Sequence, residues 1–197
     1  MMTTRVKNSL LVLFFTIMAC CYSFKSQAQG YMGKRTLFSY RVGFSPLGYA
    51  RTNFMGSLTH ELGIERVKNR RISYGVDVTY SMGEQKKDNE FYNFNLIMPT
   101  LFFRIHSLRK GSIAPLGIAN KLGIGLAAQN YTGKVAVPSS NIGLVFSWAV
   151  MKRIPLSKSL LFDYGTGITV PLTSFGDNDA AVSNSFNIRL GLTFATK

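Results

Sequence analysis

Apolar and polar residues alternate along most of this chain, with apolar residues at every second position over several long segments. The final segment shows the pattern in its simplest form. Its apolar positions are Phe186, Ile188, Leu190, Leu192 and Phe194. The positions between them are polar or small, so a strand over this segment has one apolar face and one polar face. The chain therefore predicts a series of two-faced β-strands.

Eight segments follow this pattern. They cover residues 35–45, 54–66, 71–83, 91–106, 113–128, 141–151, 159–171 and 185–195. The fourth segment is apolar on both faces, so its alternation does not show which face points which way. It also contains Pro99, which has no N–H for the strand ladder. We therefore expect a β-bulge at Pro99.

The connections between these segments alternate in length and composition. The short connections are basic and lie at residues 68–71, 109–112 and 153–158. The longer ones are rich in Gly, Asn, Asp and Ser and lie at residues 45–53, 83–90, 129–141 and 173–184. This rhythm predicts an up-and-down antiparallel sheet. Its even strand number places both chain ends on the side of the short turns.

The first residues of the chain have the features of an export signal. A positively charged start with Arg5 and Lys7 leads into an apolar stretch over residues 10–24, and Ser26 and Ala28 follow as small residues. This arrangement predicts a signal peptide that is cleaved after Ala28. The domains expected are a signal peptide at 1–28 and a barrel at 29–197.

A lipoprotein is the alternative for this region. Ile17, Met18 and Ala19 before Cys20 loosely resemble a lipobox, in which case Cys20 carries lipid. Cys20 and Cys21 are the only cysteines, so a chain cleaved after Ala28 has no thiol and no disulfide.

An export signal followed by repeated two-faced strands is typical of outer-membrane β-barrels of diderm bacteria. The polar face is repeatedly Gly, Ala, Ser or Thr, which suits the narrow lumen of a small barrel. Aromatic residues concentrate on the other face, which suits contact with lipid. We therefore predict an all-β fold, an eight-stranded antiparallel transmembrane barrel. The rival is a soluble exported β-sandwich or lipocalin-like barrel, in which the apolar face points inward.

The pattern over residues 35–197 resembles the small eight-stranded outer-membrane barrels of the OmpA/OmpX type. The resemblance implies location in the outer membrane, contact with the bilayer and lipopolysaccharide, and insertion by the barrel-assembly machinery. The chain departs from the family at its end, because Phe194 is followed by three more residues where a terminal phenylalanine is usual. Its outside loops are also shorter than those of adhesive relatives.

The chain is strongly basic, with a net charge of +14. Three of these cations precede the predicted cleavage site, which leaves +11. For an exported protein we attribute this balance to acidic lipid and lipopolysaccharide phosphates and expect no nucleic-acid partner. Basic residues crowd the three short turns, where we predict contacts with lipid headgroups at the periplasmic rim. They are Arg66, Lys68, Arg70, Arg71, Arg109, Lys110, Lys152, Arg153 and Lys158.

Charged residues of both signs also occupy the polar face of the strands. They are Arg41, Glu61, Glu65, Asp77, Lys121, Asp163 and Arg189. In a lumen as narrow as eight strands enclose, unpaired charges are costly. We therefore predict that they pair into an ion network that plugs the lumen. The alternative is a polar conduit or proton path.

Candidate catalytic and metal-binding residues are few. His60 and His106 are the only histidines, and a lipid-modifying enzyme needs a serine, a histidine and an acid within reach of one another. His106 and Ser107 are neighbours, so on a strand they point to opposite faces. Asp177 and Asp179, two apart in the last outside loop, are the candidates for contact with Ca²⁺, but isolated acidic residues in loops are usually only solvated, and there is no His/Cys cluster. We expect no metal site and no cofactor.

The sequence thus predicts a non-catalytic outer-membrane barrel with a plugged lumen and a structural or interaction role through its outside loops. A narrow channel is the second hypothesis, and a lipid-modifying enzyme is the third.

Overall fold

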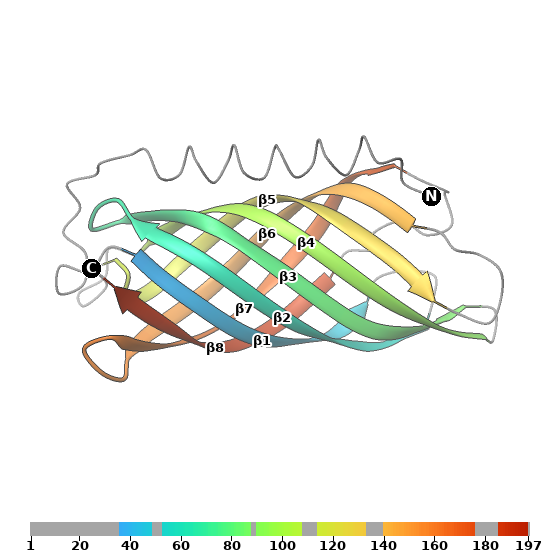
Figure 1. Ribbon diagram of the computed structural model, residues 1–197, viewed down its shortest axis with the longest axis horizontal. Helices are drawn as coiled ribbons and strands as arrows, with labels where there is room; N and C mark the ends of the chain where they lie inside the picture. Colours follow the sequence, from blue (N-terminus) through green and yellow to red (C-terminus); the bar gives the residue numbers. More distant parts are fainter. Residues whose placement is uncertain are drawn as a thin grey trace.

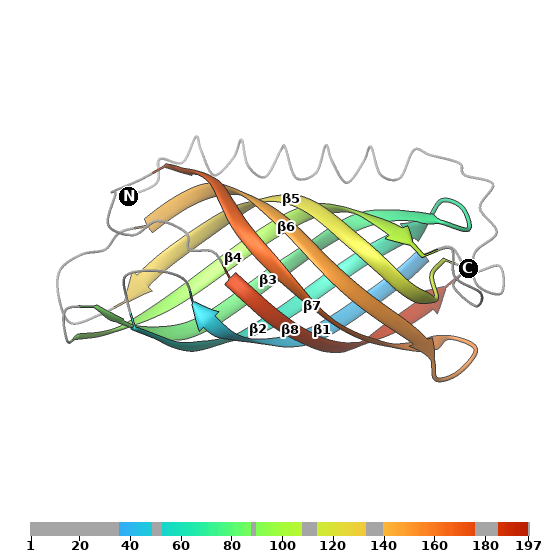
Figure 2. The same cartoon turned by 180° about the vertical axis from the view of Figure 1, so that it is seen from behind.

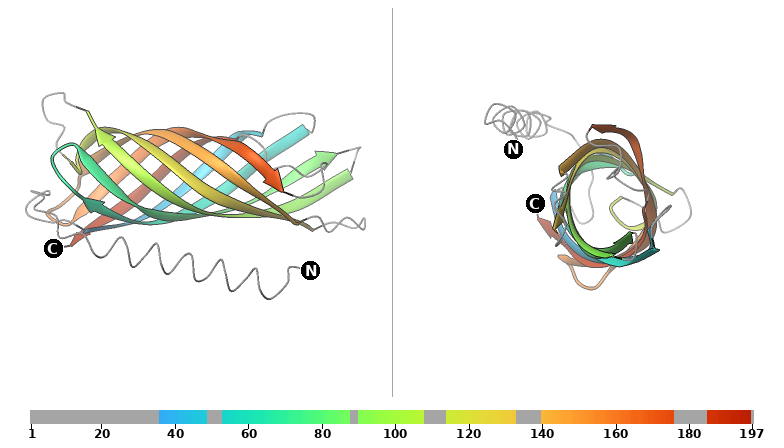
Figure 3. Two further views of the ribbon diagram at one scale, coloured as in Figure 1. Left: turned by 90° about the horizontal axis from the view of Figure 1, so that it is seen from above. Right: turned by 90° about the vertical axis from the view of Figure 1, so that its right-hand side faces the viewer.

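Eight antiparallel strands form one closed barrel, in which each strand pairs with the next and the last pairs with the first (Figure 1). The computed structural model describes residues 36–48, 53–87, 90–107, 114–132, 140–175 and 185–196, so the predicted signal peptide lies outside the described residues. The strands are β1 Thr36–Gly48, β2 Asn53–Val67, β3 Ile72–Lys87, β4 Glu90–His106, β5 Gly117–Thr132, β6 Ser140–Pro155, β7 Leu160–Phe175 and β8 Ser185–Thr196. Seen along its axis, the barrel is a single ring of strands (Figure 3).

The predicted number, order and direction of the strands are confirmed. Thr36 at the start of β1 pairs with Thr196 at the end of β8, so the blue start of β1 and the red end of β8 lie at the same end of the barrel (Figure 2). The connection expected at 83–90 is mostly strand, because β3 continues to Lys87 and β4 begins at Glu90. No helix in the described ranges is long and apolar enough to cross a membrane.

The apolar face of the strands points outward. Leu62 on β2 and Ile124 on β5 are 63% and 55% exposed, and aromatic side chains such as Phe44 and Phe194 are half exposed. The rival sandwich or lipocalin-like fold is therefore wrong, because it requires these side chains in the interior. The opposite face is buried and consists largely of small, polar and charged residues.

Inward glycines let the barrel be narrow. A Cβ added to Gly191 on β8 would lie 2.2 Å from the carbonyl oxygen of Tyr40 and 2.6 Å from Cγ of Arg41. A side chain at this position would therefore collide with the backbone of β1 and with a luminal arginine.

The bulge expected at Pro99 is wrong. Pro99 pairs with Val78 on β3, and the ladder to β5 keeps one register from Ile97, opposite Ala128, to Thr100, opposite Gly125. The strand accommodates the proline without inserting a residue. The irregularities lie elsewhere, between Phe44 and Leu47, between Phe54 and Ser57, and between Leu144 and Val145.

Pairing with β3 resolves the orientation of β4, which alternation left open. Thr100 lies opposite Asp77, and both side chains are buried inside the barrel. The even-numbered residues of β4 therefore point inward, including Phe102, Arg104 and His106.

Apolar side chains cluster inside the barrel at the end where β1 begins and β8 ends, which we call the terminal end. This cluster consists of Leu37, Val67, Ala114, Leu161 and Ala195, with Leu116 packed against it. Residues 114–116 form a turn rather than the predicted start of the fifth strand, and the Ala114 N–H donates to the Arg70 carbonyl at 2.9 Å. This turn folds over the barrel end, where Ala114 is fully buried.

Candidate functional site in the charged lumen

Nine charged side chains from all eight strands meet inside the barrel. They are Arg41, Glu61, Glu65, Asp77, Arg104, Lys121, Arg153, Asp163 and Arg189. Each is less than a tenth exposed. Alternation explains their convergence, because every one occupies an inward position of its strand. We call this set the luminal network.

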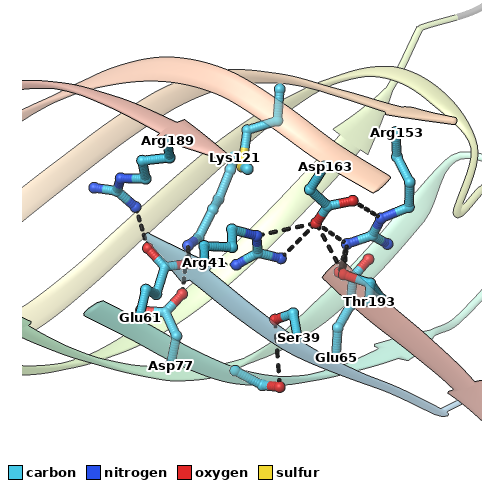
Figure 4. Close-up of polar contacts among 12 residues, drawn as sticks. Ser39, Arg41, Glu61, Glu65, Asp77, Lys121, Arg153, Asp163, Arg189 and Thr193 are labelled. Carbon is cyan, nitrogen blue, oxygen red and sulfur yellow. Dashed lines mark hydrogen bonds and ion pairs between the residues drawn. The ribbon is translucent and has the colours of Figure 1, made fainter. Parts of the chain in front are cut away.

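Arg41 on β1 lies at the centre of the luminal network (Figure 4). Its guanidinium pairs with Glu61 on β2 and with Asp163 on β7. Its Nη2 and Nε atoms lie 2.9 Å and 3.0 Å from Asp163 Oδ2. Arg41 therefore joins carboxylates that are far apart in the sequence.

Glu61 is the most heavily shared carboxylate. It accepts ion pairs from Arg41, Lys121 and Arg189, with Lys121 Nζ at 3.0 Å from Glu61 Oε1. Lys121 also pairs with Asp77 on β3. Its ammonium lies 4.7 Å from the centre of the Phe102 ring, a distance at which the ring attracts a cation.

Arg153 on β6 organises the side of the luminal network nearer the chain termini. Its Nε lies 2.5 Å from Asp163 Oδ1, and its Nη2 lies 3.1 Å from Glu65 Oε2. Arg104 Nη1 approaches the same Glu65 oxygen at 3.0 Å. Two hydroxyl groups also donate hydrogen bonds to these carboxylates. Ser73 donates to Glu65 at 2.6 Å, and Thr193 donates to Asp163 at 3.0 Å.

Eight ion pairs thus connect the nine residues without interruption, from Asp77 at one side to Arg104 at the other. A buried carboxylate or guanidinium is tolerated when partners replace its water. In the luminal network every carboxylate has at least one cation in contact. The ion pairs thus link side chains of strands that face one another across the lumen.

The structure brings together all seven residues predicted for the lumen and adds two that the sequence analysis missed. Arg104 was missed because β4 is apolar on both faces. Arg153 was placed at the periplasmic rim, which is wrong, since it is 2% exposed and paired with two carboxylates. The available signal was the alternation of β6, which continues from Ala149 through Met151 to Arg153.

The other predicted rim residues differ in their surroundings. Lys68, Arg70 and Arg71 are exposed in the turn between β2 and β3, and Lys158 is exposed in the turn between β6 and β7. Lys152 is exposed on the outer face of β6, with its ammonium 5.9 Å from the centre of the Tyr164 ring. Arg66 is half-buried on the outer face of β2. Arg109 and Lys110 lie outside the described residues.

The two histidines occupy different environments. His60 is on the outer face, with Nδ1 2.8 Å from the Tyr40 hydroxyl oxygen. His106 is buried in the lumen, with Nε2 3.3 Å from Oγ of Ser73. In a catalytic triad the acid contacts the histidine and the serine is accessible to substrate. Here Ser73 donates to Glu65 instead and is fully buried, so this trio does not have the geometry of a triad.

Within the described residues, no group of three or more His, Cys, Asp or Glu side chains is arranged to hold a metal ion. Asp177 and Asp179 lie outside the described residues.

Comparison of the sequence with protein-family models and with curated proteins finds no match. Solved structures do match. The outer membrane protein OprG from Pseudomonas aeruginosa has a TM-score of 0.53 at 9% identity, over 86% of this chain and 99% of that one.

Two further matches have lower TM-scores. Neisserial surface protein A has a TM-score of 0.48 at 12% identity, over 82% of this chain and 95% of that one. The Yersinia pestis outer membrane protein Ail has a TM-score of 0.41 at 9% identity, over 83% and 99%. At such identities the likeness to OprG concerns architecture alone. The chain therefore has the fold of a small eight-stranded outer-membrane β-barrel.

Proposed function

We propose that this protein is an integral outer-membrane barrel with a closed lumen and no catalytic activity, and that it acts through the loops opposite its termini. Membrane integration is supported by the outward apolar face. Large side chains such as Leu62, Ile124 and Leu190 are more than half exposed in the isolated chain, and a monomeric soluble protein rarely exposes so continuous an apolar surface. A bilayer provides the apolar surroundings that this face requires.

The observation that carries the closed lumen is the continuity of the luminal network. Every strand contributes at least one charged side chain, and the ion pairs cross the barrel from β1 to β7 and from β2 to β5. The apolar cluster around Leu37 and Leu161 adds a second obstruction at the terminal end. A permeating ion would have to break contacts between buried partners, which is energetically costly.

A non-catalytic role is supported by the environments of the reactive groups. Ser73 and His106 are enclosed in the lumen, and His60 faces the apolar exterior beside Tyr40. Neither arrangement offers a nucleophile, a base and an acid to a substrate.

Topology in intact cells tests the location and the orientation together. Protease added outside should cleave the long connections and spare the turns at 68–71 and 156–159.

The gel mobility of the purified protein gives a second test. The folded protein should migrate faster on a gel before heating than after heating. Cleavage of the two turns in intact cells would reverse the orientation, and a soluble, monodisperse product without detergent would refute membrane integration.

The exposed turn cations support a secondary role as lipid contacts. Lys68, Arg71 and Lys158 are exposed on the side of the chain termini, and surface cations near an anionic leaflet gain about 1 kcal/mol each. Replacing these three residues with Gln should weaken association with anionic liposomes at low salt and leave association with neutral liposomes unchanged. Equal binding of variant and parent to both lipid types would refute this role.

A further inference from the structure

We propose that the loop-side half of the lumen contains a binding site for one small monovalent anion of the size of chloride, between Arg189 and the hydroxyls of Thr79 and Thr169. The site is distinct from the contacts that close the lumen. It lies beside the luminal network, on the side away from the apolar cluster.

The first observation is an imbalance of charge. Among the described residues, the luminal network has five cations and four carboxylates. Arginine remains protonated in proteins, and Lys121 is held by two carboxylates. The interior described here therefore carries one positive charge that no carboxylate balances.

The excess charge is least compensated at Arg189. Its only carboxylate partner in the luminal network is Glu61, which also serves Arg41 and Lys121. Its Nε donates to the Asn187 side-chain oxygen at 2.6 Å, which is a neutral acceptor. By contrast, Arg41 and Arg153 each contact two carboxylates.

The second observation is a small cavity next to Arg189. Its volume is about 40 Å³, and hydroxyl side chains from several strands line it together with the apolar side chains of Phe94, Leu96 and Met98. These hydroxyl-bearing residues are Ser45, Ser57, Thr59, Thr79, Ser81, Thr169 and Ser185. None of the described residues that line the cavity is acidic. Hydroxyl donors beside a guanidinium suit an anion.

Two of these hydroxyls have no hydrogen-bond partner among the residues that the structure describes. Thr79 and Thr169 are each 4% exposed, and neither Oγ1 atom has a hydrogen-bond partner within the described part of the chain. Buried hydroxyls are normally satisfied. Thr79 on β3 and Thr169 on β7 border the cavity from different strands, and an anion there would neutralise Arg189 and accept from a hydroxyl of the wall. The volume admits roughly three water molecules, since one water needs about 10–15 Å³, and it is therefore large enough for one halide ion.

Bromide, which replaces chloride and scatters anomalously, tests the site directly. Crystals of the folded parent protein grown in sodium bromide should show an anomalous peak within hydrogen-bond distance of Arg189 and of Thr79 or Thr169. No bromide peak in the cavity would overturn the proposal, because water alone would then satisfy the hydroxyls.

Halide-dependent stability gives an independent readout in solution. At constant ionic strength, chloride should raise Tm in a saturable way relative to gluconate, because it binds only the folded state. The double variant Thr79→Val and Thr169→Val should weaken the apparent halide affinity about tenfold or more, since a charge-assisted hydrogen bond from the wall is lost whichever hydroxyl donates it.

Thr100→Val is the matched control. Thr100 is also buried in the lumen with an unpartnered hydroxyl, but it does not line the cavity. This variant should keep the full halide effect. An equal loss in Thr100→Val and in the double variant would contradict a local site, as would equal stability of the parent in chloride and gluconate.

Discussion

At the scale of single residues, the protein depends on charges that stabilise one another because they are buried together. Glu65 illustrates this dependence. Arg104 and Arg153 contact its Oε2 atom and the Ser73 hydroxyl donates to its Oε1 atom, so the carboxylate exchanges its water for three donors. Removing one partner from such a set leaves part of a buried charge uncompensated, which destabilises the folded protein.

The neighbours Arg153 and Lys152 provide a sharp comparison, because they are adjacent in sequence and lie on opposite faces of β6. Arg153→Ala should lower the free energy of unfolding by roughly 3–5 kcal/mol, since Glu65 and Asp163 both lose a cation. Lys152→Ala changes an exposed side chain and should stay within about 0.5 kcal/mol of the parent. Urea unfolding in lipid vesicles measures both. Equal losses would contradict the luminal position of Arg153.

Most of the luminal network was predictable from alternation, and the two exceptions have physical causes. Arg153 lies beyond the predicted end of its strand, where a basic residue resembles an ordinary turn residue. Arg104 belongs to a strand whose two faces are both apolar, so only pairing with β3 gives its direction. Which charges contact each other could not be predicted, because the barrel brings together residues as distant as Arg41 and Asp163.

At the scale of elements, the strands are held close by inward residues without side chains. Gly191 on β8 lies where a Cβ would meet the Tyr40 carbonyl at 2.2 Å and the Arg41 Cα at 2.7 Å. Backbone atoms cannot move aside as a flexible side chain can. The strand pair of β1 and β8, which closes the barrel, therefore requires glycine at this position.

Gly191→Ala should destabilise the folded barrel by about 1–3 kcal/mol, the range for overpacking a close-packed interior. Gly63→Ala is the milder counterpart. Its nearest obstacle is the Ser39 hydroxyl at 2.7 Å, which can rotate, and its nearest backbone atom is 3.6 Å away. The fraction of folded protein at increasing urea, read from the heat-modifiable gel shift, ranks the two. A larger loss for Gly63→Ala would contradict this explanation of barrel closure.

The elements themselves were largely predictable, because each strand repeats the same two-residue period. The errors occurred where local signals compete with pairing. Pro99 indicated a bulge, yet the ladders on both sides hold its strand in one register. Residues 114–116 were predicted to belong to the fifth strand, yet they form a turn, in which the Ala114 N–H donates to the Arg70 carbonyl.

At the scale of the whole molecule, the barrel reverses the usual distribution of residues. Its charges are inside and its large apolar side chains are outside. Such a distribution is stable only if the outer face meets an apolar solvent, and its cost in water rises with the area exposed. The exposed apolar face therefore supports the proposed integration into a membrane.

Two equally exposed apolar residues test where that surface meets lipid. Ile124 at the middle of β5 and Leu156 in the turn after β6 are both 55% exposed. Ile124→Lys should reduce stability in a bilayer by roughly 2–4 kcal/mol, and Leu156→Lys by about 1 kcal/mol or less, because the cost of a charge falls towards the interface. Refolding equilibria in lipid vesicles measure both. Equal costs would show that lipid does not cover the middle of β5.

Single-channel recording in planar bilayers tests the closed lumen most directly. The folded parent protein should give no conductance above that of an empty bilayer, because the luminal network and the apolar cluster at the terminal end both obstruct the axis. A wide porin recorded under the same conditions shows that insertion and detection work. Stable, ion-selective conductance steps from the parent protein would contradict the closed lumen and would favour the narrow-channel hypothesis instead.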